Sequence, residues 1–226
     1  MPVPNSSGPI ERINTRDIIF CTLRQWIVDG TLMPEEKISD MELANYFSTS
    51  RTPVREAIQL LSEQKLVEVV AGQGTYIAPI DKENTRQVYE MLSLLHKEAV
   101  ELAGPRITEP DIAEMERLQE DFRLAIKNSN ISDVQAADSL FHGYLVNKVG
   151  NQYLAQYVKQ LTIQVYRVEN LCFIKDMHRN QSLIAHDNIL KALREGDIQK
   201  AAKFTKENWT SFYEALDLSK KLIKNT

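Results

Sequence analysis

The sequence predicts a mainly α-helical chain of two domains, a small helical domain with one β-hairpin followed by an all-α antiparallel bundle of six helices. The chain has 226 residues, more than the roughly 100 to 150 of a typical single domain. Glycine and proline punctuate the first third and become sparse after Pro79, which predicts a boundary there. Apolar residues then recur at helical spacing. We therefore expect domains at residues 10–80 and 81–226.

The composition is typical of a globular protein and gives no sign of a membrane protein. The chain is 43% hydrophobic and 26% charged, which is typical of a globular protein, and no run of about 18 apolar residues suggests a membrane span. The start has no basic segment followed by an apolar one, so we expect a cytoplasmic protein with no membrane partner. Cys21 and Cys172 form no CxxC motif and are expected to be small buried side chains.

The first two helices follow from periodicity and capping. Residues 13–29 carry Ile19, Leu23 and Ile27 at helical spacing, and Gly30 stands at the stop position. A second, short helix is predicted from the capping box S-D-M-E that begins at Ser39, in which a hydroxyl and a carboxylate satisfy free backbone donors.

A third helix and a hairpin complete the first domain. Thr52 is expected to be the N-cap, with Pro53 at the first helical position and the helix continuing to about Gln64. Residues 67–70 and 75–78 are rich in β-branched side chains and flank AGQG, which predicts a hairpin with a four-residue tip.

Beyond the boundary the pattern is helical. Six helix starts are predicted, at Asp81, Thr108, Ser132, Asn151, His178 and Asp197. Breaks fall at Gly104-Pro105, residues 128–130, Gly150 and Gly196. Because the loops are short, consecutive helices should pack antiparallel.

The third helix is a candidate for reading DNA. Its apolar residues share one face, which leaves Arg55 and Gln59 outside and Arg51 at the N-terminal end. The order helix, short helix, turn, helix, hairpin is that of a winged helix-turn-helix, in which the last helix enters the major groove and arginine binds guanine. The alternative is a small helical unit with solvated arginines, since residues 10–80 hold seven basic and ten acidic residues.

The run ISDMELANYFSTSRTPVREAI resembles the winged helix-turn-helix of the GntR superfamily of bacterial transcription regulators, and SRTPVREAI is its most specific part. The resemblance implies that Ser50, Arg51, Thr52 and Arg55 contact bases and phosphates, and that the segment from Gly72 to Gly74 is a wing tip at the minor groove. Met41 departs from the family, which often has arginine there, so that contact is expected to be missing.

Four residues of the second domain form a candidate metal site. Asp138 and His142 are four residues apart and share one helical face. His186 and Asn208 lie at similar distances on either side of Gly196, so an antiparallel hairpin brings them level. One carboxylate and two imidazoles suit Zn²⁺, Ni²⁺ or Mn²⁺. The alternative is that these histidines are ordinary hydrogen-bonded or solvated groups.

The second domain is similar to the FCD effector domain of the FadR subfamily, and six helices match its VanR-like group. Metal-binding members of that group carry D-x-x-x-H, then a histidine, then another histidine 22 residues later. Asp138, His142 and His186 match this pattern, and Asn208 replaces the last histidine. The departure implies a metal that is held more loosely, bound with water at that position, or absent.

The sequence defines the residues that would contact an effector less clearly than the candidate metal ligands. Where the family often has arginine and glutamate, this chain has Leu92 and His96. His96 is a candidate for lining the effector pocket, and the alternative is a buried histidine with a structural role. Arg167 is a candidate partner for an anionic effector, and the alternative is an ion pair on the surface. Tyr153, Tyr157, Tyr166 and His178 are interpreted as structural, in the core or at a dimer interface.

Three functions compete at this point. The favoured one is a homodimeric regulator, expected to be a repressor, that reads a palindromic double-stranded operator and binds a small metabolite such as an organic acid. The second is an enzyme that activates water with the metal set, although the sequence offers no further base or nucleophile. The third is a helical interaction module with a vestigial DNA-binding domain.

Overall fold

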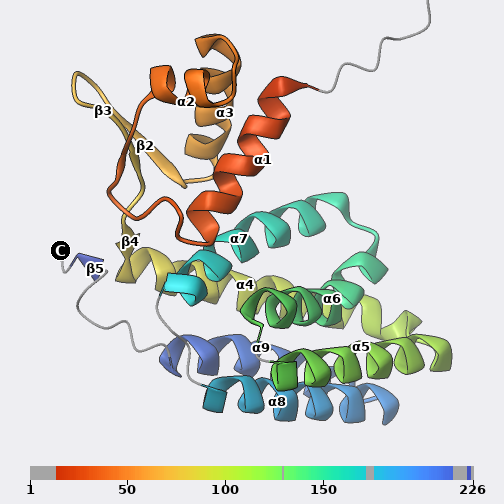
Figure 1. Cartoon of the computed structure of the whole chain (residues 1–226). Coiled ribbons are helices and arrows are strands. Elements are labelled where there is room, and N and C mark those ends of the chain that lie inside the picture. The colour runs from red at the N-terminus through yellow and green to blue at the C-terminus, as the bar shows by residue number, and fades with distance from the viewer. Residues whose placement is uncertain (1–13, 129, 172–175, 216–222, 225–226) are drawn as a thin grey trace, which may run out of the picture. The chain divides into compact units, whose positions relative to one another are not determined.

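The computed structural model describes residues 14–128, 130–171, 176–215 and 223–224 (Figure 1). Its contacts divide into two compact units, Met1–Ala78 and Pro79–Thr226. Among the described residues, no helix combines the length and apolarity that crossing a membrane requires.

The first unit contains α1 (Thr15–Val28), α2 (Asp40–Tyr46) and α3 (Arg51–Glu63). The Ser39 hydroxyl accepts a hydrogen bond from the Glu42 N–H, as the capping box predicts. The predicted cap at Thr52 is wrong. Ser50 is the last residue with extended backbone and the chain is helical from Arg51, so Pro53 lies in the first turn, where a missing N–H costs no hydrogen bond.

The core of this unit lies between α1 and α3. Ile19, Leu23 and Ile27 are buried on α1 and meet the buried apolar face of α3. Cys21 is exposed, contrary to expectation, because a position two residues from both Ile19 and Leu23 points to the opposite side of the helix. Cys172 lies outside the described residues.

A three-stranded antiparallel sheet completes the unit. It has the order β1 (Lys37–Ile38), β3 (Gly74–Ile77), β2 (Val67–Val70), and β2 and β3 form the wing. Two-residue β1 has no periodicity by which it could be predicted. The wing tip is shorter than expected because Gly74 pairs with Val70, using a φ of +124° that suits glycine.

The second unit contains the predicted bundle of six helices. The helices in the described residues are α4 (Lys82–Ala103), α5 (Glu109–Asn128), α6 (Ile131–Val149), α7 (Gln152–Leu171), α8 (Asp176–Arg194) and α9 (Ile198–Ala215), with a short 3₁₀ turn η1 (Gly104–Arg106). A parallel pair, β4 (Ile80–Asp81) and β5 (Ile223–Lys224), flanks them. Asp81 caps α4 as predicted, whereas Asn130, not Ser132, caps α6 by accepting the Ser132 N–H. The side chain of His178, inside α8, lies outside the description.

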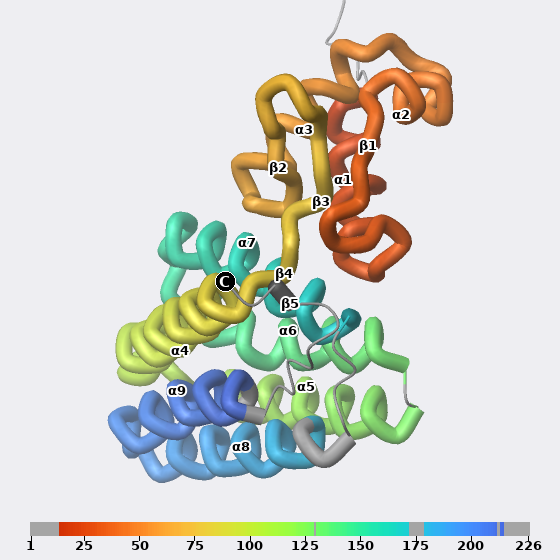
Figure 2. The backbone as a smooth tube through the Cα atoms, turned by 90° about the vertical axis from the view of Figure 1, so that its left-hand side faces the viewer, coloured from red at the N-terminus to blue at the C-terminus, as the bar shows by residue number. Residues whose placement is uncertain are grey.

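The helices pack so that α6, α8 and α9 share an interior. α4 packs against α6, α7 and α9, α5 against α6 and α8, and α8 against α9 (Figure 2). Gly196 takes a left-handed φ of 73° between α8 and α9, as their tight turn requires. Tyr153 and Tyr157, at 64% and 56% exposure, do not belong to the core of a single chain.

Candidate functional site

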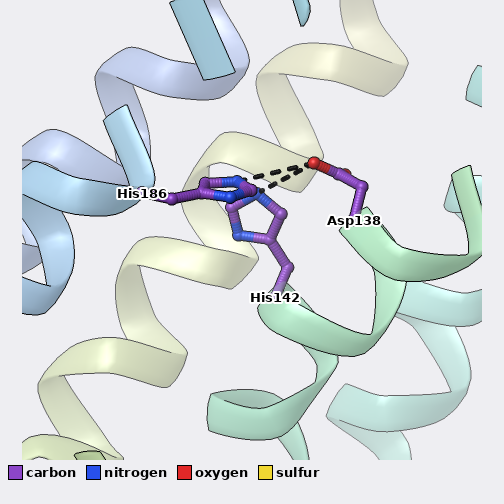
Figure 3. Close-up of side chains that lie close together, drawn as sticks. All are labelled: Asp138, His142 and His186. Atoms are coloured by element: carbon purple, nitrogen blue, oxygen red, sulfur yellow. Dashed lines mark hydrogen bonds and ion pairs between the residues drawn. The ribbon is translucent and has the colours of Figure 1, made fainter. Parts of the chain in front are cut away.

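Asp138, His142 and His186 converge inside the bundle. α6 supplies the first two from consecutive turns and α8 supplies the third (Figure 3). Their potential ligand atoms all lie within 4.8 Å of one another. His186 is fully buried and His142 is 4% exposed, whereas the side chain of Asp138 is 27% exposed, so solvent reaches the group from the carboxylate side.

The separations suit ligands of one ion. The two Nε2 atoms of His142 and His186 are 3.0 Å apart, and Asp138 Oδ1 lies 3.5 Å from His186 Nε2 and 3.9 Å from His142 Nε2. Ligands at about 2.1 Å from a metal are roughly 3.0 Å apart in octahedral and 3.4 Å apart in tetrahedral geometry. Asn208, from α9, places Nδ2 3.2 Å from His142 Nε2. The structure therefore brings together all four residues of the predicted set.

Gln119, on α5, fixes the orientation of His186. Its Nε2 donates to the Leu183 carbonyl at 3.0 Å and to Asp187 Oδ1 at 2.9 Å, so its Oε1 must face His186 Nδ1, 2.9 Å away. Nδ1 then carries the proton, and the Nε2 lone pair is left for a metal. Nothing in the spacing of the sequence singles out Gln119, because the contact joins two helices far apart in the chain.

The chemistry of the imidazoles also fits a cation. His142 Nε2 accepts from the Asn208 amide and His186 Nε2 is unprotonated, so two lone pairs face each other across 3.0 Å. Burial lowers the pKa of His142 to about 3 and that of His186 well below its usual value, so neither ring takes up a second proton that would fill the gap between the two Nε2 atoms. A divalent ion bound by both nitrogens removes this repulsion. The buried group of Asp138, His142 and His186 could therefore bind a metal.

The affinity for a metal is expected to fall below about pH 7, because the Asp138 carboxyl carries a proton there. Burial raises the pKa of this carboxyl from 3.8 to about 7, whereas both imidazoles are already neutral there. An incoming ion must displace the Asp138 proton below that pH, so affinity should fall about tenfold per pH unit. Calorimetric titration with Zn²⁺ in buffers of different ionisation enthalpy should show release of about one proton per ion near pH 6. Release of two or more protons would contradict this assignment.

A cavity with about 50 Å³ of space for the centres of water-sized groups adjoins the cluster. Asp138, His142 and Asn208 lie in its wall beside apolar side chains such as Phe122 and Val134. The cavity therefore leaves room for a few water-sized groups next to the candidate metal ligands.

The cavity also has a polar wall that sequence analysis missed. Glu169 accepts a hydrogen bond from Gln135 Nε2 at 2.9 Å, and Tyr166 donates to the Gln135 carbonyl at 2.7 Å. Burial raises the pKa of Glu169 to about 8, while Gln135 and then Arg179 act in the opposite direction. Tyr166, interpreted from the sequence as structural, thus also lines the cavity.

The two predicted effector residues lie elsewhere. His96, on α4, is 3% exposed and stacks on Trp209 with ring centroids 4.8 Å apart, and its ring lies 5.3 Å from that of His142. Burial lowers the pKa of His96 well below its usual value, and nearby His142 adds to the effect. Arg167 is 2% exposed and borders a different cavity, beside Asp81 and Thr85. The structure therefore does not place either of them in the wall of the cavity beside the cluster.

The residues predicted to contact DNA lie on α3 and the wing. Arg51, Thr52, Arg55 and Gln59 are exposed on α3, and Ser50 is exposed just before it. Gly72 is exposed at the wing tip, and Gly74 is half-buried against Lys37. Both arginines form ion pairs with Asp40, at the start of α2.

Comparison with known proteins points to one kind of function. A model of the FCD domain matches residues 87–210, and a model of bacterial regulatory proteins of the gntR family matches residues 15–77. The chain is 27% identical over 204 residues to the HTH-type transcriptional repressor RspR of Escherichia coli K12, covering 89% of each chain. It is 26% identical over 182 residues to the HTH-type transcriptional regulator YdhC of Bacillus subtilis 168, covering 80% of this chain and 81% of YdhC.

Solved structures show the same fold. The structure of E. coli McbR/YncC superposes with a TM-score of 0.72 at 20% identity, covering 90% of this chain and 99% of that one. RspR and YdhC are named as transcriptional regulators, not as enzymes.

Proposed function

The chain belongs to the GntR family of bacterial regulatory proteins and carries an FCD domain, and we propose that it is a repressor whose DNA binding responds to a small metabolite. Its DNA-binding winged helix-turn-helix and its effector-type domain define a transcription regulator. The finer assignment to repression is supported by RspR and by the gluconate operon transcriptional repressor of Bacillus licheniformis, 23% identical over 64% of this chain.

We assign residues 10–80 to DNA binding and residues 81–226 to effector binding and dimerisation. Arg51, Thr52, Arg55 and Gln59 are exposed on one helix whose opposite face is buried, as a recognition helix requires. A palindromic operator with half-sites about one helical turn apart then calls for a homodimer.

The observation that carries the effector assignment is the cavity beside Asp138, His142 and His186. Three protein ligands and a weak amide at Asn208 leave coordination positions on a bound Zn²⁺, Ni²⁺ or Mn²⁺ that face this cavity. Small organic acids suit such positions because carboxylate oxygens are good ligands for these ions. The ligand would act by favouring one arrangement of the two domains over another.

The enzyme hypothesis is not supported by the relatives, which are regulators. A metal in this cavity would serve instead to hold the carboxylate of the effector, while Gln119 holds His186 in its metal-binding orientation.

Selection from a random duplex library tests this function. The full chain with its tag removed should enrich a palindromic sequence and bind it as a dimer by light scattering. A panel of small mono- and dicarboxylic acids, with Zn²⁺ present, should contain members that raise the melting temperature and change affinity for the enriched duplex. Failure to enrich any sequence, or a monomer both free and on DNA, would contradict the proposal.

A further inference from the structure

One acidic side chain of the first unit contacts both arginines at the start of α3. Asp40, the first residue of α2, accepts from Arg51 Nη2 with both carboxylate oxygens at 2.9 Å and from Arg55 Nε at 2.5 Å. The side chain of Asp40 is only 22% exposed, whereas those of Arg51 and Arg55 are 52% and 63% exposed. The carboxylate is thus partly enclosed between two cations that remain accessible.

This arrangement restrains two flexible side chains at once. Two guanidinium groups repel each other, and the shared carboxylate offsets that repulsion at close range. Charge-assisted hydrogen bonds to both arginines hold the pKa of Asp40 below its usual value, so it is ionised whenever the protein is folded near neutral pH. The three hydrogen bonds leave most of the ten N–H donors of the two arginines available to DNA.

The negative charge of Asp40 also affects the affinity for DNA that lacks the operator sequence. Contacts to phosphates carry no sequence information but supply most of the affinity for arbitrary duplex. An anion beside the two arginines weakens that general attraction, while fixed guanidinium orientation favours base edges that match it.

We propose that Asp40 is a specificity-determining positioning residue, which holds Arg51 and Arg55 for base readout and opposes binding to arbitrary DNA. This inference rests on the proposed function, because it assumes that α3 reads an operator. It adds a residue outside the recognition helix to the determinants of sequence preference.

The test is the specificity ratio of Asp40→Asn in the full chain. The probes are the duplex enriched by the wild type from a random library and a scrambled duplex of equal length and composition, titrated at several salt concentrations. Asp40→Asn should bind the enriched duplex more weakly and the scrambled duplex no more weakly, so that the ratio falls about tenfold, or roughly 1.4 kcal/mol. A second selection with Asp40→Asn should give a less defined sequence.

Glu56→Gln is the matched control. Glu56 is exposed on α3 and makes no ion pair within the described part of the chain, so its loss removes one negative charge without freeing an arginine. The ratio should then stay within about twofold, because charge alone raises both affinities together. Asp40→Ser places a smaller neutral side chain at the first helical position and leaves the Ser39 cap in place. It is expected to repeat the result if Asp40→Asn has a lower melting temperature than the wild type.

An unchanged ratio in Asp40→Asn and Asp40→Ser would overturn the inference while leaving the regulator intact. An equal fall in Glu56→Gln would also overturn it, since charge and not position would then be the cause. If the wild type enriches no sequence, the proposed function and the inference fail together.

Discussion

His142→Ala is expected to abolish stoichiometric binding of a divalent metal. His142 Nε2 lies at the centre of the cluster, 3.0 Å from His186 Nε2, 3.2 Å from Asn208 Nδ2 and 3.9 Å from Asp138 Oδ1. Loss of residues that only orient a ligand costs about 10- to 100-fold in affinity, so loss of an imidazole ligand should cost more than roughly 100-fold. Elemental analysis of tag-free protein after dialysis against Zn²⁺, with calorimetry, measures the effect.

Asn208→His should change the affinity in the opposite direction. The Asn208 amide already lies beside His142 Nε2, and an imidazole there would give the ion a third nitrogen ligand. We expect tighter Zn²⁺ binding and a larger rise in melting temperature when Zn²⁺ is added.

The variant His96→Ala tests whether His96 is a structural residue, in contrast to the proposed metal ligand His142. His96 is as buried as His142 but stacks on Trp209, so its loss should lower the melting temperature and leave one Zn²⁺ per chain. Two results together would contradict the metal site: a wild type that holds less than about one Zn²⁺ per two chains, and an Asn208→His variant that binds Zn²⁺ no more tightly. The cavity would then bind an organic effector without a metal.

Much of this site could be predicted because its pattern is local. The four-residue spacing of Asp138 and His142 fixes a shared helix face, and the glycine at 196 fixes the turn that sets His186 level with Asn208. Each step depends only on helix geometry and a turn, both of which are visible in the chain itself.

The parts that could not be predicted depend on packing between distant elements. Gln119 reaches His186 from another helix, and Glu169 enters the cavity from α7, with no periodicity to connect them. Asp40 meets Arg51 and Arg55 because α2 packs against α3, whereas the sequence indicates only that α2 begins near Ser39. The sequence places His96 near the effector site, whereas the structure stacks its ring on Trp209 and does not include it in the cavity wall.

Arg55→Ala is expected to weaken binding to the enriched duplex by about 1 to 3 kcal/mol and to relax base preference at one position of each half-site. Arg55 is 63% exposed on the first turns of α3, and Asp40 occupies its Nε, which leaves both terminal amino groups for the O6 and N7 atoms of a guanine. Arg16→Ala, which removes one positive charge from α1, is the matched control and should reduce binding to enriched and scrambled duplexes by the same small factor. Titrations of both variants against both duplexes at fixed salt measure the difference. Because Arg55 is exposed and its loss leaves the core intact, unchanged affinity for both duplexes would mean that α3 is not the recognition helix.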